Sequence, residues 1–582
     1  MAFVLWRSAA AVLSLCLLHF CHSEKAPNYS FVKSAEHAPP ISYYDYIIVG
    51  GGTAGCPLAA TLSQKFKVLL LERGGSPYGN KNITNLAYFA NTLADDSPTS
   101  ASQRFVSEDG VINARARVLG GGSCLNAGFY TRASPQYVRK AGWDWRLVNE
   151  SYRWVEKIVV FEPPVLQWQS ALRDGLLEVG LTPFNGYSFD HIYGTKVGGT
   201  IFDMDGHRHT AADLLEYTNP GGLTVLLHAR VGKIMFRHNG KQRPVAHGVV
   251  FRDPAGTKHK AYLKKGTKNE IILSAGAIGS PQLLMLSGIG PRSHLESLGI
   301  RVLVDQPNVG RGMADNPMNA IFVPSPEPVE VSLIQVVGIT KFGSFVEGAS
   351  GSNFASPTSG EPTSRNFGMF SPQTGQLSTV PPKQRTPEAI ARAVHAMNNI
   401  EESFFRGGFI LEKVAGPLSR GHLELRNRNP DDNPSVTFNY FKDPLDLQRC
   451  IKGIETIEKV VQSKAFSRFR YPYISIEALL NMTANFPTNM IPRHDNDSKS
   501  LAQYCKDTVM TIWHYHGGCQ VERVVDYDYK VLGVDALRVI DGSTFNSSPG
   551  TNPQATVMML GRYMGIRIQN ERLGTHEAES KA

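Results

Sequence analysis

The sequence predicts an α/β fold that opens with a Rossmann-type βαβ unit and continues into a second, α+β part. The first observation is a short apolar run, Tyr46 to Val49, followed by a glycine turn and a second apolar run, Lys67 to Leu71. Leu58 and Leu62 lie between the runs at helical spacing. The second observation is the length of 582 residues, which is too long for one compact core. The third is a composition shift near residue 323.

The glycine turn has the spacing of a dinucleotide-binding motif. The first glycine permits the tight turn, the second lets a pyrophosphate approach the backbone, and the third lets the helix pack closely on the strand. An acidic residue at the end of the second strand can accept hydrogen bonds from ribose hydroxyls. A purely structural glycine turn is the alternative. The predicted contact residues of this unit are Gly50, Gly52, Thr53, Ala54, Gly55, Glu72 and Arg73.

Composition excludes some functions and indicates others. The formal charge is +9, but the 60 Lys and Arg are scattered among 51 Asp and Glu without a dense basic run, so nucleic acid is not an expected partner. Residues 1–23 carry Arg7 and an apolar run, Ala9 to Phe20, which predicts a signal peptide; an uncleaved anchor is the competing interpretation. The sequence has no other long uninterrupted apolar segment, so we expect no stable membrane span. We therefore expect a secreted protein, extracellular or in the cell wall.

The cysteines and the asparagines fit secretion. Five cysteines remain after residue 23, with no C-x-x-C pair and no metal pattern, and one disulfide is expected in an oxidising compartment. Cys56 and Cys124 lie in glycine-rich segments and are expected to be small buried thiols. Glycosylation triplets begin at Asn28, Asn82, Asn149, Asn481, Asn496 and Asn546.

The predicted domains follow the order of the chain. Residues 43–322 form the main part of the nucleotide domain, with interspersed segments of the substrate domain, and 323–500 form a substrate domain on an antiparallel sheet. Residues 501–573 return to the first domain. Predicted strands are 225–231, 248–251, 270–277, 409–412 and 422–425, and an amphipathic helix is predicted over 445–463.

Two long motifs carry a family resemblance. Arg117 to Tyr130 contains three successive glycines that let the backbone pass close to a ligand. This segment resembles the first signature of the glucose-methanol-choline (GMC) oxidoreductases, and Gly279 to Gly290 resembles their second. The resemblance runs from about residue 43 to 573 and implies bound FAD and oxidation of a small-molecule alcohol.

The resemblance also implies site residues. The strand end at Ala275 to Ala277 is expected near the cofactor, and Cys450 and Cys505 are expected to pair as in the plant hydroxynitrile lyases of this family. The further FAD contacts it implies are Val118, Gly122, Asn126, Ala127, Gly128, Phe129, Val231, Trp513, His514, Asp541, Gly542, Asn552, Gln554 and Ala555.

The chemical centre is predicted in Thr511 to Cys519. Histidine's unperturbed pKa, about 6.5, suits proton transfer near neutral pH, although a buried structural histidine is the alternative. In an extended segment His514 and His516 share a face, so periodicity cannot choose between them. The resemblance places His514 at the catalytic histidine and Asn552, 38 residues on, at the second catalytic position. Without the resemblance, Asn552 is equally a loop residue before a helix.

The implied mechanism is proton removal by His514, a hydrogen bond from Asn552 to the developing alkoxide, and hydride transfer to flavin N5. Two plant branches compete. The hydroxynitrile lyases share residues 513–518 but carry histidine where Asn552 stands. Segments 375–388, 408–414 and 550–556 resemble a branch that oxidises long-chain ω-hydroxy fatty acids. A flavoprotein without turnover is the third possibility, and the electron acceptor is undetermined.

Overall fold

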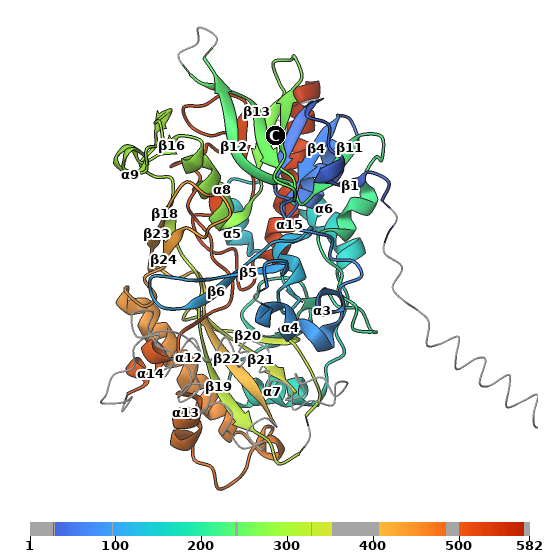
Figure 1. The fold of residues 1–582 in the computed structure, drawn as a ribbon. Coiled ribbons are helices and arrows are strands. Elements are labelled where there is room, and N and C mark those ends of the chain that lie inside the picture. Colours follow the sequence, from blue (N-terminus) through green and yellow to red (C-terminus); the bar gives the residue numbers. More distant parts are fainter. Residues whose placement is uncertain are drawn as a thin grey trace, which may run out of the picture.

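The computed structural model describes residues 27, 29–95, 97–238, 243–327, 329–351, 407–484 and 500–574. It shows two large bodies of structure, one around a parallel sheet and one around an antiparallel sheet (Figure 1). The predicted signal peptide, the triplets at Asn28 and Asn496, and the segment 375–388 lie outside the described residues.

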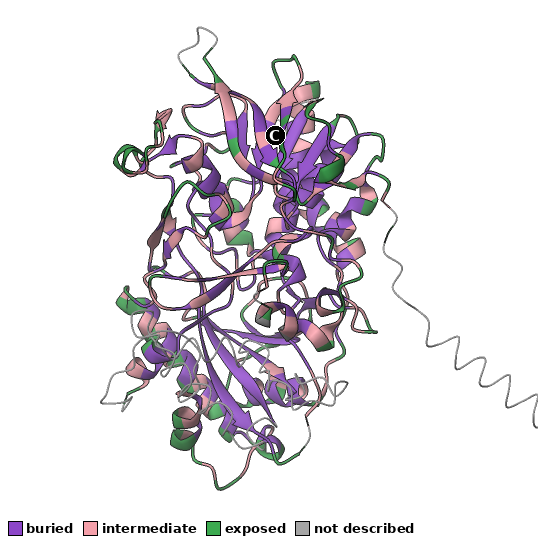
Figure 2. Ribbon diagram, viewed as in Figure 1, coloured by how far each residue is buried: buried purple, intermediate pink, exposed green. Residues whose placement is uncertain are grey.

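The first body confirms the Rossmann-type prediction. Six strands pair in parallel throughout, in the order β1-β11-β4-β3-β15-β26. The apolar runs of the central strands are fully buried, as expected for a parallel sheet that is covered on both faces (Figure 2). Helix α2 contacts β3 and β4, and strands of the second sheet contact β3 and β15. Helix α15 (Gln554–Leu573) packs against α2 (Gly55–Leu62) and α6 (Trp145–Val159). The strands are β1 (Val32–Ser34), β11 (Leu223–Leu227), β4 (Val68–Leu71), β3 (Tyr46–Val49), β15 (Glu270–Leu273) and β26 (Leu537–Val539).

Two predicted strands are wrong in extent. The run 225–231 is divided at His228, whose φ of 57° turns the chain, because its two halves belong to different sheets. Val231 therefore lies on a second strand, β12. The run 270–277 ends at Leu273, and helix α8 (Gly276–Leu286) begins within it. The second sheet has the order β12 (Arg230–Arg237), β13 (Val245–Arg252), β14 (Lys258–Leu263) and β2 (Ile41–Tyr44).

The second body is built on a seven-stranded sheet in which every pair is antiparallel except β8–β9. Helices α12 (Pro444–Gln462) and α7 (Gln167–Glu178) pack on one face through Ile321, Val346 and Ile410. The other face carries a separate apolar cluster that includes Phe322 and Leu411. The strands, in order, are β25 (Met510–Thr511), β19 (Pro317–Pro324), β22 (Gly407–Val414), β21 (Ser344–Ser350), β20 (Val336–Ile339), β9 (Gly194–Val197) and β8 (Phe184–Tyr187).

The predicted disulfide is confirmed. Cys450 on α12 is bonded to Cys505 on α14 (Leu501–Asp507), and Cys56, Cys124 and Cys519 are free and buried. The remaining elements are α3 (Lys81–Thr84), α4 (Phe89–Ala94), β5 (Ser102–Val106), β6 (Ile112–Ala116), β7 (Phe129–Tyr130), α5 (Pro135–Lys140), β10 (Gly199–Thr200), β16 (Ile289–Gly290), α9 (Arg292–Ser297), β17 (Val304–Asp305), β18 (Arg311–Met313), β23 (Gly421–Glu424), β24 (Ser435–Thr437) and α13 (Ile476–Ala484). Within the described ranges, no helix is both long and apolar enough to cross a bilayer.

Candidate active site

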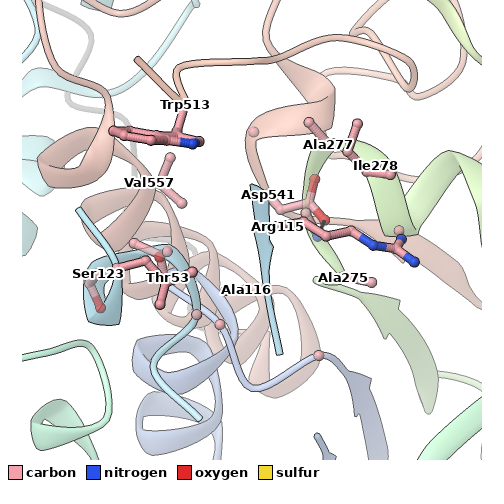
Figure 3. A pocket seen from close by; sticks show the side chains of 18 of the residues that line it. Thr53, Arg115, Ala116, Ser123, Ala275, Ala277, Ile278, Trp513, Asp541 and Val557 are labelled. Atoms are coloured by element: carbon pink, nitrogen blue, oxygen red, sulfur yellow. Dashed lines mark hydrogen bonds between the residues drawn. The ribbon is translucent and has the colours of Figure 1, made fainter. Parts of the chain in front are cut away.

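A cavity of about 300 Å³ is lined by residues from both bodies. Figure 3 shows side chains from separate parts of the chain around it: Thr53 and Ser123 from glycine-rich segments, Ala275 from the start of α8, and Trp513 and Asp541 from the C-terminal segment. The cavity therefore depends on segments that are several hundred residues apart in the sequence.

The glycines of the two turns are needed because backbone packs on backbone. A Cβ added to Gly50 would lie 2.4 Å from Ser274 O, and one added to Gly121 would lie 2.6 Å from Gly52 Cα. Gly121 also has a φ of +62°, which side chains rarely adopt. A side chain at any of these positions would displace the turns that line the cavity.

The structure brings nearly all the predicted site residues to the lining of one cavity. Gly55 and Ala555 are the exceptions. Gly55 instead packs under the turn, where its Cβ would lie 2.0 Å from Gly50 O, as the close-packing role predicts. The predicted residues on the wall are Gly50, Gly52, Thr53, Ala54, Glu72, Arg73, Val118, Gly122, Asn126, Ala127, Gly128, Phe129, Val231, Trp513, His514, Asp541, Gly542, Asn552 and Gln554.

Glu72 has a second role that its position in the motif did not predict. Its Oε2 accepts a hydrogen bond from Gly51 N at 2.9 Å, and its Oε1 accepts one from Gly74 N at 2.7 Å. Burial raises the pKa of this carboxyl, although the two backbone N–H groups oppose the shift. Glu72 therefore holds the glycine turn in place from the cavity wall.

Other predicted residues bond one another across the chain. Asn126 Nδ2 donates to Gln554 Oε1 at 2.9 Å, and Gln554 Nε2 donates to Phe129 O at 2.6 Å. Asp541 Oδ2 accepts from Gly276 N at 2.9 Å, at the start of α8. Wall residues thus lie at or beside the N-termini of α2, α8 and α15, where free N–H groups favour a phosphate. A glycine-lined cradle with three helix starts fits a dinucleotide such as FAD.

His514 and Asn552 line the same cavity. The backbone N–H of His514 donates to Asp315 Oδ1 at 2.9 Å, and its Nδ1 lies 3.1 Å from Asn316 Nδ2. Because Asn316 engages Nδ1, Nε2 is the ring nitrogen left for a substrate. Burial, followed by the charges of Lys413 and His516, holds the pKa of His514 well below its usual 6.5, so the ring is neutral at neutral pH.

His516 also lines the cavity, but its ring is oriented by backbone. Its Nδ1 lies 3.1 Å from His514 O, to which it donates, and its Nε2 is buried without a hydrogen-bond partner among the described residues. Burial lowers the pKa of His516 to about 4. The choice between the two histidines, which periodicity left open, is still made by the resemblance to the family.

Four polar residues around His514 were not predicted as site residues. Asp315 and Asn316 precede the apolar strand β19, Lys413 lies in β22, and Glu347 lies in β21. All four are buried. Charged residues inside otherwise apolar strand runs are the sequence signal that could have found the last two.

A surface group of a different kind lies outside the cavity wall. Ligand atoms of Asp203, Asp205 and His207 lie within 4.8 Å of one another, and the group is empty. The three residues are partly or fully exposed, as many acidic surface groups are.

Comparison with known proteins decides the family. Models described as GMC oxidoreductase match residues 44–318 and 417–561. The chain is 57% identical to protein HOTHEAD of Arabidopsis thaliana over 534 residues, covering 92% of this chain and 89% of that protein. The chain belongs to the GMC oxidoreductase family. It is an FAD-dependent oxidoreductase of the type that acts on alcohols, as the two sequence signatures predict.

Other GMC oxidoreductases show how far the likeness extends. The (R)-mandelonitrile lyase-like protein of Arabidopsis thaliana is 47% identical over 93% of both chains, and sinalpyl alcohol oxidase Nec3 of Nesocodon mauritianus is 43% identical over 94% of this chain and 91% of that one. A formate oxidase structure from Aspergillus oryzae has a TM-score of 0.70, covering 93% of this chain and 100% of that chain at 19% identity, which shows the fold alone.

Proposed function

We propose that this GMC oxidoreductase oxidises the terminal hydroxyl of long-chain ω-hydroxy fatty acids to the aldehyde. The observation that carries the proposal is that His514 and Asn552 line the same cavity as the predicted FAD-binding glycines. A base, a hydrogen-bond donor and a dinucleotide cradle are the components that alcohol oxidation requires.

In this mechanism His514 Nε2 accepts the hydroxyl proton. A neutral imidazole has one nitrogen that donates and one that accepts, so Nδ1 must then carry the ring proton. This requires Asn316 to present its amide oxygen to Nδ1. A half-turn of the amide achieves this and gives a donor to the buried Asn316 Oδ1, which has no partner among the described residues in the present orientation. The same half-turn breaks the 3.3 Å hydrogen bond from Asn316 Nδ2 to Thr551 O, whereas Ser548 Oγ can donate to the amide oxygen instead.

Asn552 holds the substrate oxygen. Its Nδ2 group is the donor of the side chain and can serve the substrate oxygen, and its Oδ1 is buried without a donor among the described residues. An N–H donated to the oxygen stabilises the negative charge that develops as the proton leaves. The bound FAD supplies the acceptor for the carbon-bound hydride.

The proposed substrate class is supported by the relatives and by the apolar residues that line the cavity. The segments that resemble the ω-hydroxy fatty acid branch include Gly408 to Val414. The match to HOTHEAD covers 89% of the length of that protein. Ile334 and Ile512 from the antiparallel-sheet side line the cavity and suit an alkyl chain. The name of Nec3 assigns alcohol oxidation to a further relative.

Anaerobic mixing with an ω-hydroxy fatty acid tests the proposal. The oxidised-flavin absorbance should bleach with the wild-type protein, and His514→Ala should slow the bleaching by about 10²-fold or more while FAD stays bound. Bleaching at an unchanged rate would remove His514 from the mechanism. Absence of bleaching in the wild type, with a panel of primary alcohols, would reject alcohol oxidation.

Hydroxynitrile cleavage is the second candidate, because the (R)-mandelonitrile lyase-like protein is 47% identical. It requires no net change in flavin oxidation state. Cyanide released from mandelonitrile without bleaching would favour it over oxidation, and silence in both assays would favour a flavoprotein without turnover.

We also propose that the protein is secreted. The Cys450–Cys505 disulfide supports an oxidising compartment. N-terminal sequencing of the protein from its native tissue should begin near residue 24, and a start at residue 1 would reject a cleaved signal.

A further inference from the structure

Two charged side chains are buried in the middle of the seven-stranded sheet. Lys413 on β22 forms an ion pair with Glu347 on β21, and both side chains are 0% exposed. In the strand register Lys413 lies opposite Phe345 and Glu347 lies opposite Leu411, so the two are diagonal neighbours on one face. Lys413 lines the cavity, so this is the cavity face of the sheet.

A buried ion pair of this kind is weak evidence for stability. Removing two charges from water costs several kcal/mol per ion, and apolar replacements of similar volume are often as stable. Here Glu347 Oε1 is buried without a hydrogen-bond partner among the described residues, which adds to the free-energy cost of burying the pair. The pair therefore calls for an explanation other than folding.

The explanation lies in what the two groups face. Burial raises the pKa of the Glu347 carboxyl, and Lys413 and the nearby Asn552 side chain oppose the shift. Lys413 in turn lies close enough to His514 for its charge to lower the pKa of the imidazole. Lys413, His514 and Asn552 line the same cavity, so the two members of the pair lie near the two halves of the reaction centre, Lys413 near His514 and Glu347 near Asn552.

We propose that Glu347 and Lys413 form one positioning unit for the reaction, in which Glu347 orients the Asn552 amide and Lys413 sets a positive charge beside His514. The inference rests on the proposed alcohol oxidation and deepens it. Glu347 accepts one N–H of the Asn552 Nδ2 group, which directs the second N–H toward the substrate oxygen. The Lys413 charge keeps His514 neutral before the substrate binds and favours a negative oxygen beside it afterwards.

Other charged groups face the same atoms and must be held constant. His516 adds to the lowering of the His514 pKa, and Asp315 accepts from the His514 backbone N–H. Asp315 is held in turn by Tyr440 and Thr511, and burial raises its pKa to about 6. On the Glu347 side, Lys196 of β9 is also nearby, and burial lowers its pKa to about 7.

The decisive measurement is the pH profile of flavin reduction. Lys413→Met removes the charge but keeps a side chain of similar length, so the pKa of His514 should rise and the limb that reports the base should move to higher pH by about one unit or more. The double variant Glu347→Gln with Lys413→Met has no charge at either position, so its base limb should lie at the same raised pH as that of Lys413→Met. Lys413→Arg should restore the position of the wild-type limb.

Glu412 supplies the matched control. It is the neighbour of Lys413 on β22 and is equally buried, but it lies on the opposite face, where its Oε1 accepts from Ser344 Oγ at 2.6 Å. Glu412→Gln should leave the pH limb in place. If Glu412→Gln moves the limb as far as Lys413→Met, or if Lys413→Met does not move it, the positioning unit is rejected.

Glu347→Gln tests the orientation of Asn552. It should lower the limiting rate of flavin reduction by about tenfold or more in protein that retains its FAD, whereas the Tm should fall below that of the Glu412→Gln control because Lys413 loses its buried partner. Equal rates in Glu347→Gln and wild type would reject the orientation role.

A binding experiment keeps the inference separate from the proposed function. A long-chain tertiary alcohol has no carbinol hydrogen and cannot be oxidised, so its dissociation constant can be measured by calorimetry across pH. The pH dependence of that constant should shift in Lys413→Met and not in Glu412→Gln, even if the wild type bleaches with no alcohol. If the wild type bleaches with the alcohol but the pH dependence of the dissociation constant is the same in Lys413→Met, only the positioning unit is rejected. If the wild type does not bleach but that pH dependence shifts in Lys413→Met, only the proposed oxidation is rejected.

Discussion

His516 should make the protein sensitive to mild acid. Its pKa is lowered by burial to about 4 in the folded state, whereas an unfolded histidine titrates near 6.5. Below pH 6.5 the unfolded chain binds a proton that the folded protein does not, so stability is intact above that pH and is lost as the pH falls toward 4. The structural reason is that a protonated ring would bury an Nε2–H without an acceptor among the described residues.

The size of the effect follows from the two pKa values. At about 1.36 kcal/mol per pKa unit, the full gap corresponds to roughly 3.4 kcal/mol, of which about 2.4 kcal/mol is lost between pH 7 and pH 4.5. Other buried histidines add to the total slope, so the contribution of His516 must be isolated by comparison with a variant that does not titrate.

His516→Asn keeps a polar side chain and removes the titration. Urea unfolding of the two FAD-loaded proteins at pH 7, 6, 5 and 4.5 should give free energies of unfolding that converge as the pH falls, by about 2 kcal/mol. Parallel curves would refute the assignment of a neutral, buried His516. Since His514 is the proposed base, the oxidised-flavin absorbance of the His516→Asn protein should still bleach when the substrate is added.

Three further variants test the site and the fold. Asn316→Asp places an acceptor-only carboxylate beside Nδ1 of His514, so the base limb of the pH profile should move up by about one unit, and an unmoved limb would argue against this contact. Gly121→Ala combines a φ of +62° with a backbone clash, so purified protein should carry little FAD by absorbance, whereas stoichiometric FAD would contradict the cradle. Cys450→Ala with Cys505→Ala opens a crosslink between residues 55 apart and should lower stability by about 2 to 4 kcal/mol, whereas an unchanged denaturation midpoint would contradict it.

Patterns within a short stretch of sequence predicted the helices and strands that such a stretch determines. The glycine spacing after Tyr46 to Val49 predicted the first βαβ unit, and helical periodicity predicted a helix over 445–463 within one residue at each end. The division at His228 was missed because it depends on the sheet to which each half belongs, and a run of apolar residues carries no such information.

The site shows the same limit more clearly. Glycines and helix starts carry their own signals, so the cradle was predictable residue by residue. The surroundings of His514 were not, because Asp315 and Asn316 reach it only through the pairing of β19 with the C-terminal segment. Hydrogen bonds between residues almost 200 positions apart leave no periodic trace in one sequence.

The register of β22 decides which charge meets the reaction centre. Side chains alternate along a strand, so Lys413 faces the cavity only because Glu412 faces α12, and a slip of one residue would exchange them. On the helix side, Glu412 lies over Gly453, where an added Cβ would come within 2.0 Å of Glu412 Cγ. A larger residue at 453 would push Glu412 and its strand away from the helix. The charge beside His514 therefore depends on a glycine on the far side of the sheet, which contacts neither substrate nor cofactor.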